Sequence, residues 1–426
     1  MGYLKFEIKR IWQEQKIFLG VILIILSLFL LYLVNQNNAK NEYITIENAI
    51  KFTKEDMERN KQVTIQSIES MKKDGAEVSK ETEKKILAED EEISRVYLTN
   101  YESFQSKNYT TYMQNELINL QNFDTEMFLE NNSSVFTNSS VVFSKYLDGK
   151  QLLNNSLLKK KLIPESTRYG TSNYMFLVSA LQYITSVLGI VIFLLLFGNI
   201  HLKKIENKKM RLNFVQPISR TLMLLIDSCL FLLQSFFFLL SLILISYLIG
   251  YLFGTHIPSD YPLISLINGK VQLIPISNYI LKNALLFLAV LFFSFELSQL
   301  AIIVSKNNFI AIAVVVVVLF GLGRTAQIEN NTKINGSQWN PFTYIESSKL
   351  FIGKDNVQLN QNITSSINEE NSIESVYFYE NPAYYSGTTL STNNVNINLK
   401  NGWIALFCGS ICLLLINRFI YRKITI

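Results

Sequence analysis

The stretch "NIHLKKIENKKMRLNFVQPISR", residues 199–220, decides how this chain is arranged. It lies between two long apolar runs and carries six basic side chains against a single acid, Glu206. A short loop rich in Lys and Arg between two membrane spans stays in the cytoplasm, because its translocation is disfavoured. We therefore expect residues 200–220 to form a cytoplasmic loop that fixes the orientation of the segments around it.

The apolar runs on either side belong to a larger set. The chain has 426 residues, of which 49% are hydrophobic and 17% charged, a composition that favours a protein crossing the membrane several times. A helix needs about 20 mostly apolar residues to cross a bilayer. Six stretches meet or approach this length: 17–34, 174–200, 221–253, 280–304, 309–323 and 403–420. Only residues 305–308 separate the fourth from the fifth, which predicts a tight helical hairpin.

The charges of the short connecting segments favour one topology. With the N-terminus inside, segments 1–16, 200–220, 305–308 and 418–426 are cytoplasmic and together hold 14 Lys and Arg but 3 Asp and Glu. Segment 35–172 would lie outside, and long segments are translocated whatever their charge. The sequence thus predicts an all-α polytopic protein of the cell membrane, with six transmembrane helices and both termini in the cytoplasm.

Five regions follow from this topology: an amphipathic interfacial helix and first span (1–34), a large helical extracytoplasmic insertion (35–172), four spans with the cytoplasmic loop (173–325), a smaller extracytoplasmic segment of mixed structure (326–400), and the last span with a basic tail (401–426). In the insertion, the spacing of apolar residues such as Ile65, Ile68 and Met71 predicts long helices packed as a hairpin, with a turn at Asp74-Gly75. In 326–400, the alternating pieces "SVYFYE" and "NVNINL" indicate strands or turns.

No motif of a catalytic or nucleotide-binding site is present. The sequence has no G-x-x-x-x-G-K-[ST] loop for nucleotide phosphates, no H-E-x-x-H zinc motif and no G-x-S-x-G nucleophile. Its two histidines are too few for a His-based metal site. We therefore expect no enzymatic activity in the chain itself, no cofactor, no metal ion, and no nucleic acid among its partners.

The cytoplasmic loop resembles the first cytoplasmic loop of ABC type-2 permeases, the membrane subunits of many bacterial ABC exporters. Those proteins often show an acid, a Gly-Thr pair, a Leu, and then Pro-x-Ser-Arg leading into the third span. This chain has the same order in Glu206, Leu212, Pro217, Ser219 and Arg220. It departs from the pattern at Lys208-Lys209, which stand where the family has Gly-Thr. A second similarity is "WNPFTYIESSKLFIGK", residues 339–354, which is similar to the Asn-Pro-aromatic segment before the last span of those permeases.

The resemblance implies a permease that moves an amphipathic substrate (a peptide, lipid or drug, including antimicrobial-peptide export or self-immunity). A separate cytoplasmic ABC ATPase would drive it, and the permease would act as a homodimer or heterodimer in the lipid bilayer. A short helix in 200–220 would dock in the ATPase and pass on its movement. The implied coupling residues are Glu206, Leu212, Phe214, Pro217, Ser219 and Arg220. Pro217 suits a helix boundary and Ser219 the N-cap of the third span. The alternative is a solvated basic loop that only sets topology.

Charged residues inside the predicted spans are the remaining candidates. Glu296 lies near the centre of the fourth span, with Gln299 beside it. Acids at membrane depth are costly and face a bundle interior or a wet cavity, so Glu296 and Gln299 are candidates for a substrate pathway. The alternative is that they form hydrogen bonds between helices. Asp227, at the cytoplasmic end of the third span, is expected to be interfacial or ion-paired.

Two other classes of function stay open. The chain could be a membrane sensor whose insertion 35–172 binds a ligand, although no cytoplasmic segment is large enough for an output domain. It could also be an ion-coupled secondary transporter that uses Glu296. Against that reading, the sequence shows no pair of similar halves and no broken helices.

Overall fold

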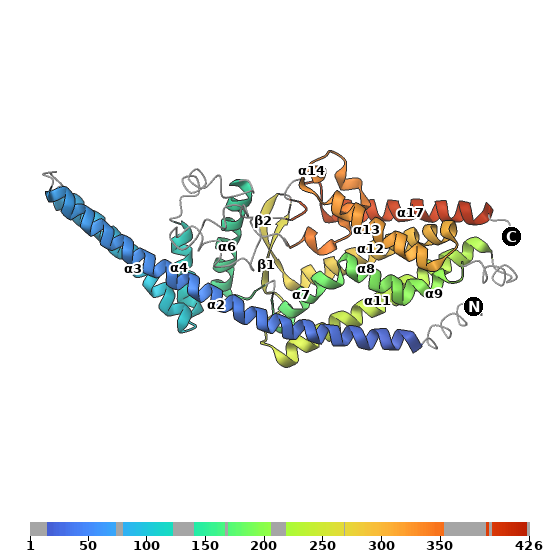
Figure 1. The fold of residues 1–426 in the computed structure, drawn as a ribbon, viewed down its shortest axis with the longest axis horizontal. Coiled ribbons are helices and arrows are strands. Elements are labelled where there is room, and N and C mark those ends of the chain that lie inside the picture. The colour runs from blue at the N-terminus through green and yellow to red at the C-terminus, as the bar shows by residue number, and fades with distance from the viewer. Residues whose placement is uncertain are drawn as a thin grey trace.

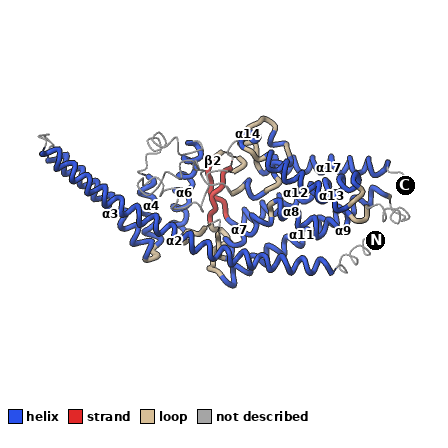
Figure 2. Tube along the Cα trace, in the orientation of Figure 1, coloured by secondary structure: helices blue, strands red, loops and turns tan. Residues whose placement is uncertain are grey.

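The computed structural model describes residues 15–73, 80–121, 140–166, 169–205, 219–267, 269–352, 389–391 and 394–423. The molecule is elongated: a long helical hairpin projects from one end, a bundle of membrane-length helices forms the other, and a small sheet lies between them (Figure 1, Figure 2). Five described helices are long and apolar enough to cross a membrane, or six if one bent pair counts as a single span. The prediction of a mainly helical multi-pass membrane protein is thereby confirmed.

The projecting hairpin consists of two helices, α2 and α3. Helix α2 (Gln15–Lys73) runs without a break from the first predicted span into the insertion, and α3 (Lys80–Gln105) packs back along its second half (Figure 1). Near the base of the hairpin, Tyr43 stacks on Phe104 with 4.9 Å between the ring centroids. The predicted helical hairpin is confirmed, while its turn at residues 74–75 lies outside the described residues.

A buried ion pair holds the next two helices together. Helix α4 (Tyr109–Gln121) packs against α6 (Ser140–Lys160). The Glu116 carboxylate of α4 accepts a hydrogen bond from Asn154 and forms an ion pair with Lys150, whose Nζ lies 2.5 Å away, and all three residues are buried. Because breaking a buried pair leaves an uncompensated charge, this contact fixes α4 against α6.

Helix α2 is fastened to the bundle at one buried point. Its apolar first half exposes most of its side chains within the single chain. At Asn35, however, the side-chain Nδ2 donates to the Ser179 Oγ at 2.9 Å, and Tyr32 packs edge-on against Phe176 with 5.1 Å between ring centroids. A buried amide must find its hydrogen-bond partners within the protein, so Asn35 sets the position of α2 along the bundle.

Glu165 organises the junction between the insertion and the bundle. Its carboxylate accepts hydrogen bonds from the Ser172 Oγ at 2.9 Å and from the Thr255 Oγ1 at 3.0 Å. Its backbone N–H donates to the Tyr261 hydroxyl at 2.9 Å, and that hydroxyl donates to the Ile163 carbonyl at 3.1 Å. Burial raises the pKa of Glu165, and the two hydroxyl hydrogen bonds only partly offset this effect.

The segment predicted as the second span is bent, whereas the sequence predicted one continuous helix over 174–200. It consists of α7 (Asn173–Ile184), α8 (Val187–Phe193), the π-helical turn η1 (Leu194–Gly198) and α9 (Asn199–Leu202). The axis changes direction by 75° between α7 and α8. The expectation that the chain contains no broken helix is therefore wrong.

Local chemistry explains the bend. Ser186 has an extended backbone (φ −92°, ψ 175°), which interrupts the helical hydrogen bonds. The Thr185 Oγ1 donates to the Leu181 carbonyl at 2.7 Å, a side-chain bond that competes with the backbone ladder. The two helical pieces approach so closely that a Cβ at Gly189 would lie 1.7 Å from the Ile184 carbonyl oxygen. Only glycine fits at this position.

Helix α12 forms the centre of the bundle. It spans Ile276–Ser305 and packs against α11 (Arg220–Phe253), α13 (Asn308–Ala326), α17 (Leu399–Lys423) and the pieces of the second span. In its most apolar stretch 67% of the residues are buried, against 39% or less in the other helices that meet the span criterion singly. The predicted hairpin to α13 is confirmed, with Lys306 in the left-handed region (φ 55°) and the Asn307 side chain capping α13.

A β-hairpin between α11 and α12 was not predicted. Strand β1 (Pro262–Ile267) pairs antiparallel with β2 (Lys270–Pro275), and Gly269 has a φ of +75° in the connection. The all-α prediction is wrong in this detail. The sequence carries the signal, because Asn-Gly between two alternating apolar pieces is a strong marker of a two-residue hairpin loop.

The segment 326–400 has no strand among its described residues, which form α14 (Glu329–Thr332) and the short 3₁₀ turns η2 (Ser337–Trp339), η3 (Pro341–Tyr344) and η4 (Ser347–Leu350). The piece "NVNINL" is a turn that leads into α17, one of the two structures predicted for it. The piece "SVYFYE" lies outside the described residues.

The helix ends that adjoin the four segments predicted to be cytoplasmic lie at one end of the bundle. The start of α2, the end of α9, the α12–α13 turn and the end of α17 lie together there, whereas α14 and the β-hairpin lie toward the opposite end (Figure 1). The side chains of Asn308 and Asn199 form a hydrogen bond at the shared end. The grouping of these segments agrees with the charge pattern of the sequence.

The buried Glu165 carboxyl predicts a pH-dependent stability. Its pKa is raised in the native state, so the native protein binds this proton more tightly than the unfolded chain does, and stability falls as the pH rises through the native pKa. We expect Glu165→Gln to raise the thermal unfolding midpoint at pH 8 and to leave it unchanged at pH 4.5, measured on the detergent-purified protein.

The exposed Asp260 provides the matched control. Its hydrogen bond and ion pair with Lys160 (2.6 Å) lower its pKa, which is the opposite direction. Asp260→Asn should therefore not raise the midpoint at pH 8. A midpoint below wild type for Glu165→Gln at pH 8 would contradict the role given to burial.

Candidate functional site

Two neighbouring groups of polar side chains, all buried except the half-buried Gln234, lie where α9, α11, α12 and α17 meet. The first, called here the crossing cluster, consists of Ser228, Glu296, Gln299 and Asn417. The second, called the loop-base cluster, consists of His201, Lys204, Asp227 and Gln234. Both are close to the end of the bundle at which α9 ends and α11 begins, the two helices that flank the loop of residues 206–218.

The crossing cluster joins three helices through one carboxylate. The Glu296 Oε1 of α12 accepts a hydrogen bond from the Ser228 Oγ of α11 at 2.7 Å. The Asn417 Nδ2 of α17 lies 3.2 Å from the other carboxylate oxygen and 2.9 Å from the Glu296 backbone carbonyl, and it donates to both. All three residues are at most 3% exposed. The hydrogen bonds between helices that the sequence offered as one reading of Glu296 are present, and a role in a substrate pathway stays a prediction.

The same cluster retains unused hydrogen-bonding capacity. The Gln299 Nε2 donates to the Ser228 Oγ at 3.3 Å, but the Gln299 Oε1 and the Asn417 Oδ1 have no partner among the described residues. An unsatisfied buried polar atom costs about 1–3 kcal/mol. The cluster can therefore accept a hydrogen bond from an additional donor, and this is the chemistry that a hydroxyl, amide or ammonium group of a ligand would supply.

The loop-base cluster is built on a buried ion pair. The Asp227 Oδ1 accepts hydrogen bonds from the Lys204 Nζ at 2.5 Å and from the His201 Nδ1 at 3.0 Å. The other ring nitrogen of His201 lies 3.2 Å from the Gln234 Oε1. Because Lys204 follows α9 and Asp227 belongs to α11, the pair ties together the two sides of the loop. Asp227 was predicted to be interfacial or ion-paired, and the ion pair is confirmed.

The two clusters are connected through α11. Asp227 and Ser228 are successive residues, so one turn of this helix holds a member of each cluster. Next to them, Phe231 of α11 stacks on Phe295 of α12 with 4.2 Å between ring centroids, and Phe295 also contacts the His201 ring edge-on. One turn of α11 and the Phe295 ring therefore link the loop-base cluster to the hydrogen bonds of Glu296.

The predicted coupling residues are only partly within the described chain. Ser219 is the N-cap of α11, as predicted, and its Oγ accepts a hydrogen bond from the Leu222 N–H at 3.3 Å. Arg220 is the first residue of α11. The other four, Glu206, Leu212, Phe214 and Pro217, lie outside the described residues. Their proposed contact with an ATPase stays a prediction.

Several members of the clusters were not singled out from the sequence. The sequence does contain a cue for Asn417, which is a single amide in an apolar run. Polar residues within spans commonly form contacts between helices. His201 and Lys204 fall within the predicted cytoplasmic loop 200–220, and neither was singled out there. Their partner Asp227 is 23 or more residues away in sequence, and only the fold brings the three together.

Comparison with known proteins adds no assignment. No protein-family model, no curated protein and no solved structure matches the chain. The fold and the two clusters define a multi-pass helical membrane protein with an ion-paired loop base and a buried carboxylate at a three-helix crossing. Any narrower function rests on the residues described above.

The loop-base ion pair predicts a specific pattern of stability. Removing one partner leaves the other charge buried, so Lys204→Met and Asp227→Asn should each lower the free energy of unfolding by about 3 kcal/mol. The double variant should lose less than the sum of the two single losses, because neither charge is then left alone. Thermal unfolding of the detergent-purified variants measures this coupling.

Lys203 offers a matched control, because it is adjacent in sequence but only half-buried. Lys203→Met should change the unfolding midpoint little. Strictly additive losses for Lys204→Met and Asp227→Asn would contradict the pairing.

Proposed function

We propose that this chain is the permease subunit of an ABC exporter, which moves an amphipathic substrate across the cell membrane with energy from a separate cytoplasmic ATPase. The substrate class is a peptide, lipid or drug, with antimicrobial-peptide export or self-immunity as specific cases. Both termini would lie in the cytoplasm, and two permease chains, alike or different, would form the transporter. The observation that carries the proposal is the anchoring of both sides of the loop 206–218 to the core of the bundle.

The anchoring fits a loop that transmits force. On one side, Lys204 is held by the buried Asp227 carboxylate. On the other, Ser219 caps the rigid helix α11, in which Asp227 lies two turns further on. A loop that only sets topology requires the positive charge, but it does not require a buried ion pair between its two sides. A loop pushed by a soluble partner requires such a base, because otherwise the movement would be lost in fraying of the helix ends.

A route from the loop into the bundle supports the same function. Asp227 is followed by Ser228, whose hydroxyl binds Glu296 of α12, and Glu296 in turn binds Asn417 of α17. Rigid-body shifts of packed helices are a common means of transmitting conformational change. In this proposal the ATPase moves the loop, and the crossing cluster passes the displacement to three helices at once.

The position of the insertion is compatible with a role in handling substrate. The hairpin of α2 and α3 projects from the end of the bundle opposite to the one at which α9 ends (Figure 1). With the loop in the cytoplasm, the insertion lies outside the cell. There it would meet a peptide or lipid that leaves the transporter or arrives from the surroundings.

An ion-coupled secondary transporter is the second candidate, and one observation favours it. Broken spans are typical of such transporters, and the second span is bent by 75° between α7 and α8. Glu296, a buried carboxylate, would be the coupling group. Transport that follows the proton gradient in vesicles lacking any ATPase would support this candidate against the first.

The exporter proposal is tested by recovery of the ATPase. The full-length protein, solubilised in mild detergent, is used to capture the products of neighbouring genes, and ATP hydrolysis by the captured complex is measured. We expect one ATPase to be recovered. Replacing Glu206, or Leu212 together with Phe214, by alanine should abolish its capture and the transport it drives while membrane insertion stays normal.

A control variant separates coupling from general basic charge at the same end of the bundle. Lys423→Gln alters the basic tail at the end of α17 and should leave ATPase capture unchanged. Unchanged capture and transport in the Glu206 and Leu212/Phe214 variants would contradict the coupling role. Failure to capture any ATPase would contradict the exporter proposal as a whole.

A further inference from the structure

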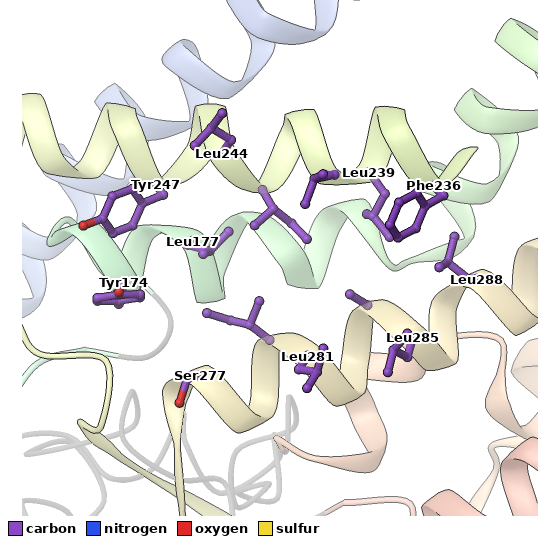
Figure 3. A pocket seen from close by; sticks show the side chains of 14 residues that line it. Tyr174, Leu177, Phe236, Leu239, Leu244, Tyr247, Ser277, Leu281, Leu285 and Leu288 are labelled. Atoms are coloured by element: carbon purple, nitrogen blue, oxygen red, sulfur yellow. The ribbon is translucent and has the colours of Figure 1, made fainter. Parts of the chain in front are cut away.

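A long apolar groove runs between α7, α11 and α12, and none of its lining residues belongs to either polar cluster. Its volume is about 460 Å³. All but three of its fourteen lining residues are Leu, Ile, Ala or Phe. The three exceptions, Tyr174, Tyr247 and Ser277, lie together at one end, and Phe236 and Leu288 lie at the other (Figure 3). The groove therefore has hydroxyl groups at the end nearer the β-hairpin and is apolar along the rest of its length.

The dimensions of the groove restrict its occupant. From Phe236 to Tyr247, α11 rises by about 17 Å at 1.5 Å per residue. Distributed over that length, the 460 Å³ of the groove corresponds to a mean cross-section of about 27 Å², roughly a third or less of the cross-section of a helix with its side chains. A helix with its side chains is about 10–12 Å across, so a helix from a second copy of the chain does not fit into the groove. An extended hydrocarbon chain does.

The surroundings indicate where such a chain comes from. Leu240, Leu244 and Leu281 line the groove and are each more than half exposed, so it opens sideways from helices that are long and apolar enough to span the membrane. No water is available in the hydrocarbon core to fill it, and an empty groove would leave its wall without dispersion contacts. Apolar cavities of this kind take up apolar ligands.

The hydroxyl end matches the level of lipid head groups. Tyr174 is the second residue of α7, Ser277 is the second residue of α12, and Tyr247 lies in the last third of α11, so all three are toward the β-hairpin end of their helices. The rings of Tyr174 and Tyr247 lie 5.1 Å apart between centroids. Tyrosines at this level pack against acyl chains and donate hydrogen bonds to polar groups at the membrane interface.

We propose that the groove binds one acyl chain of a bilayer phospholipid, with the chain lying from Tyr247 toward Phe236 and the ester and head group at the Tyr174–Tyr247–Ser277 end. The lipid belongs to the leaflet on the side of the β-hairpin. It completes the packing of α11 against α12 on the face that the rest of the chain leaves open. The inference is independent of the exporter proposal, because it depends only on the groove and on its depth in the membrane.

The test is photocrosslinking of the full-length protein in nanodiscs made with a phosphatidylcholine that carries a diazirine in the middle of one acyl chain. Adducts are located by proteolysis and mass spectrometry. We expect labelling to be concentrated on residues 240–244 and 281–285 and to exceed that of the exposed Val317 on α13, which faces ordinary annular lipid. Native mass spectrometry after delipidation should show one retained phospholipid.

Filling the groove should remove both the concentrated crosslinking and the retained phospholipid. Ala284→Trp places an indole within the groove, and Leu244→Trp fills it from the exposed rim, so that a folding defect in the first variant does not decide the result. Each should lose the concentrated labelling and the retained lipid, whereas Val317→Trp should keep both.

Three results would overturn the proposal: groove labelling no stronger than at Val317, labelling unchanged in both filled variants, or crosslinks from a photoreactive leucine at position 244 to a second copy of the chain in place of lipid. The last result would assign the groove to an interface between copies. None of these outcomes depends on an ATPase, so failure here is distinguishable from failure of the exporter proposal.

Discussion

A carboxylate inside a membrane bundle is tolerated only where the protein itself supplies its hydrogen bonds, and this requirement determines how the core of the molecule is built. Glu296 takes one hydrogen bond from Ser228 of α11 and another from Asn417 of α17. Three helices that are far apart in sequence are thereby held in one register. The buried Lys204–Asp227 pair lies next to this crossing and attaches the two sides of the 206–218 loop to it. In the proposed mechanism, a displacement of the loop is passed to the core through these contacts.

A second set of polar contacts connects the projecting insertion to the same bundle. Asn35 fixes the long helix α2 against α7, and Glu165 joins the segment after α6 to Ser172 at the start of α7 and to Thr255 after the end of α11. Both contacts involve the α7 part of the bent segment, whereas the loop-base cluster involves its α9 part, beyond the bend. The bend between α7 and α8 thus lies between the insertion and the loop, where a change in angle would alter both.

The sequence predicted the features that depend on local pattern, and it missed those that depend on long-range contact. The length of the apolar runs predicted the membrane-length helices, and the distribution of basic residues predicted which segments lie together at one end of the bundle. The N-cap role of Ser219 was predicted from its position before an apolar run. The bend at Thr185-Ser186 was missed because both residues are compatible with a helix and only the packing around Gly189 shows the break. For Asp227 the sequence left two alternatives, an interfacial position or an ion pair. The partners in the ion pair could not be named, because side chains more than 20 residues apart in sequence meet only in the folded chain.

Hydrogen–deuterium exchange of the purified protein in detergent tests most directly whether the loop base and the three-helix crossing act as one unit. Wild type is compared with Asp227→Asn, which removes the charge at the loop base and leaves every member of the crossing cluster in place. The account predicts faster exchange in α12 around Glu296 and in α17 around Asn417, as well as in α9 and the start of α11, with no change in Lys203→Met. Faster exchange confined to residues 199–230 would show that the loop base moves independently of the crossing, and would contradict the account.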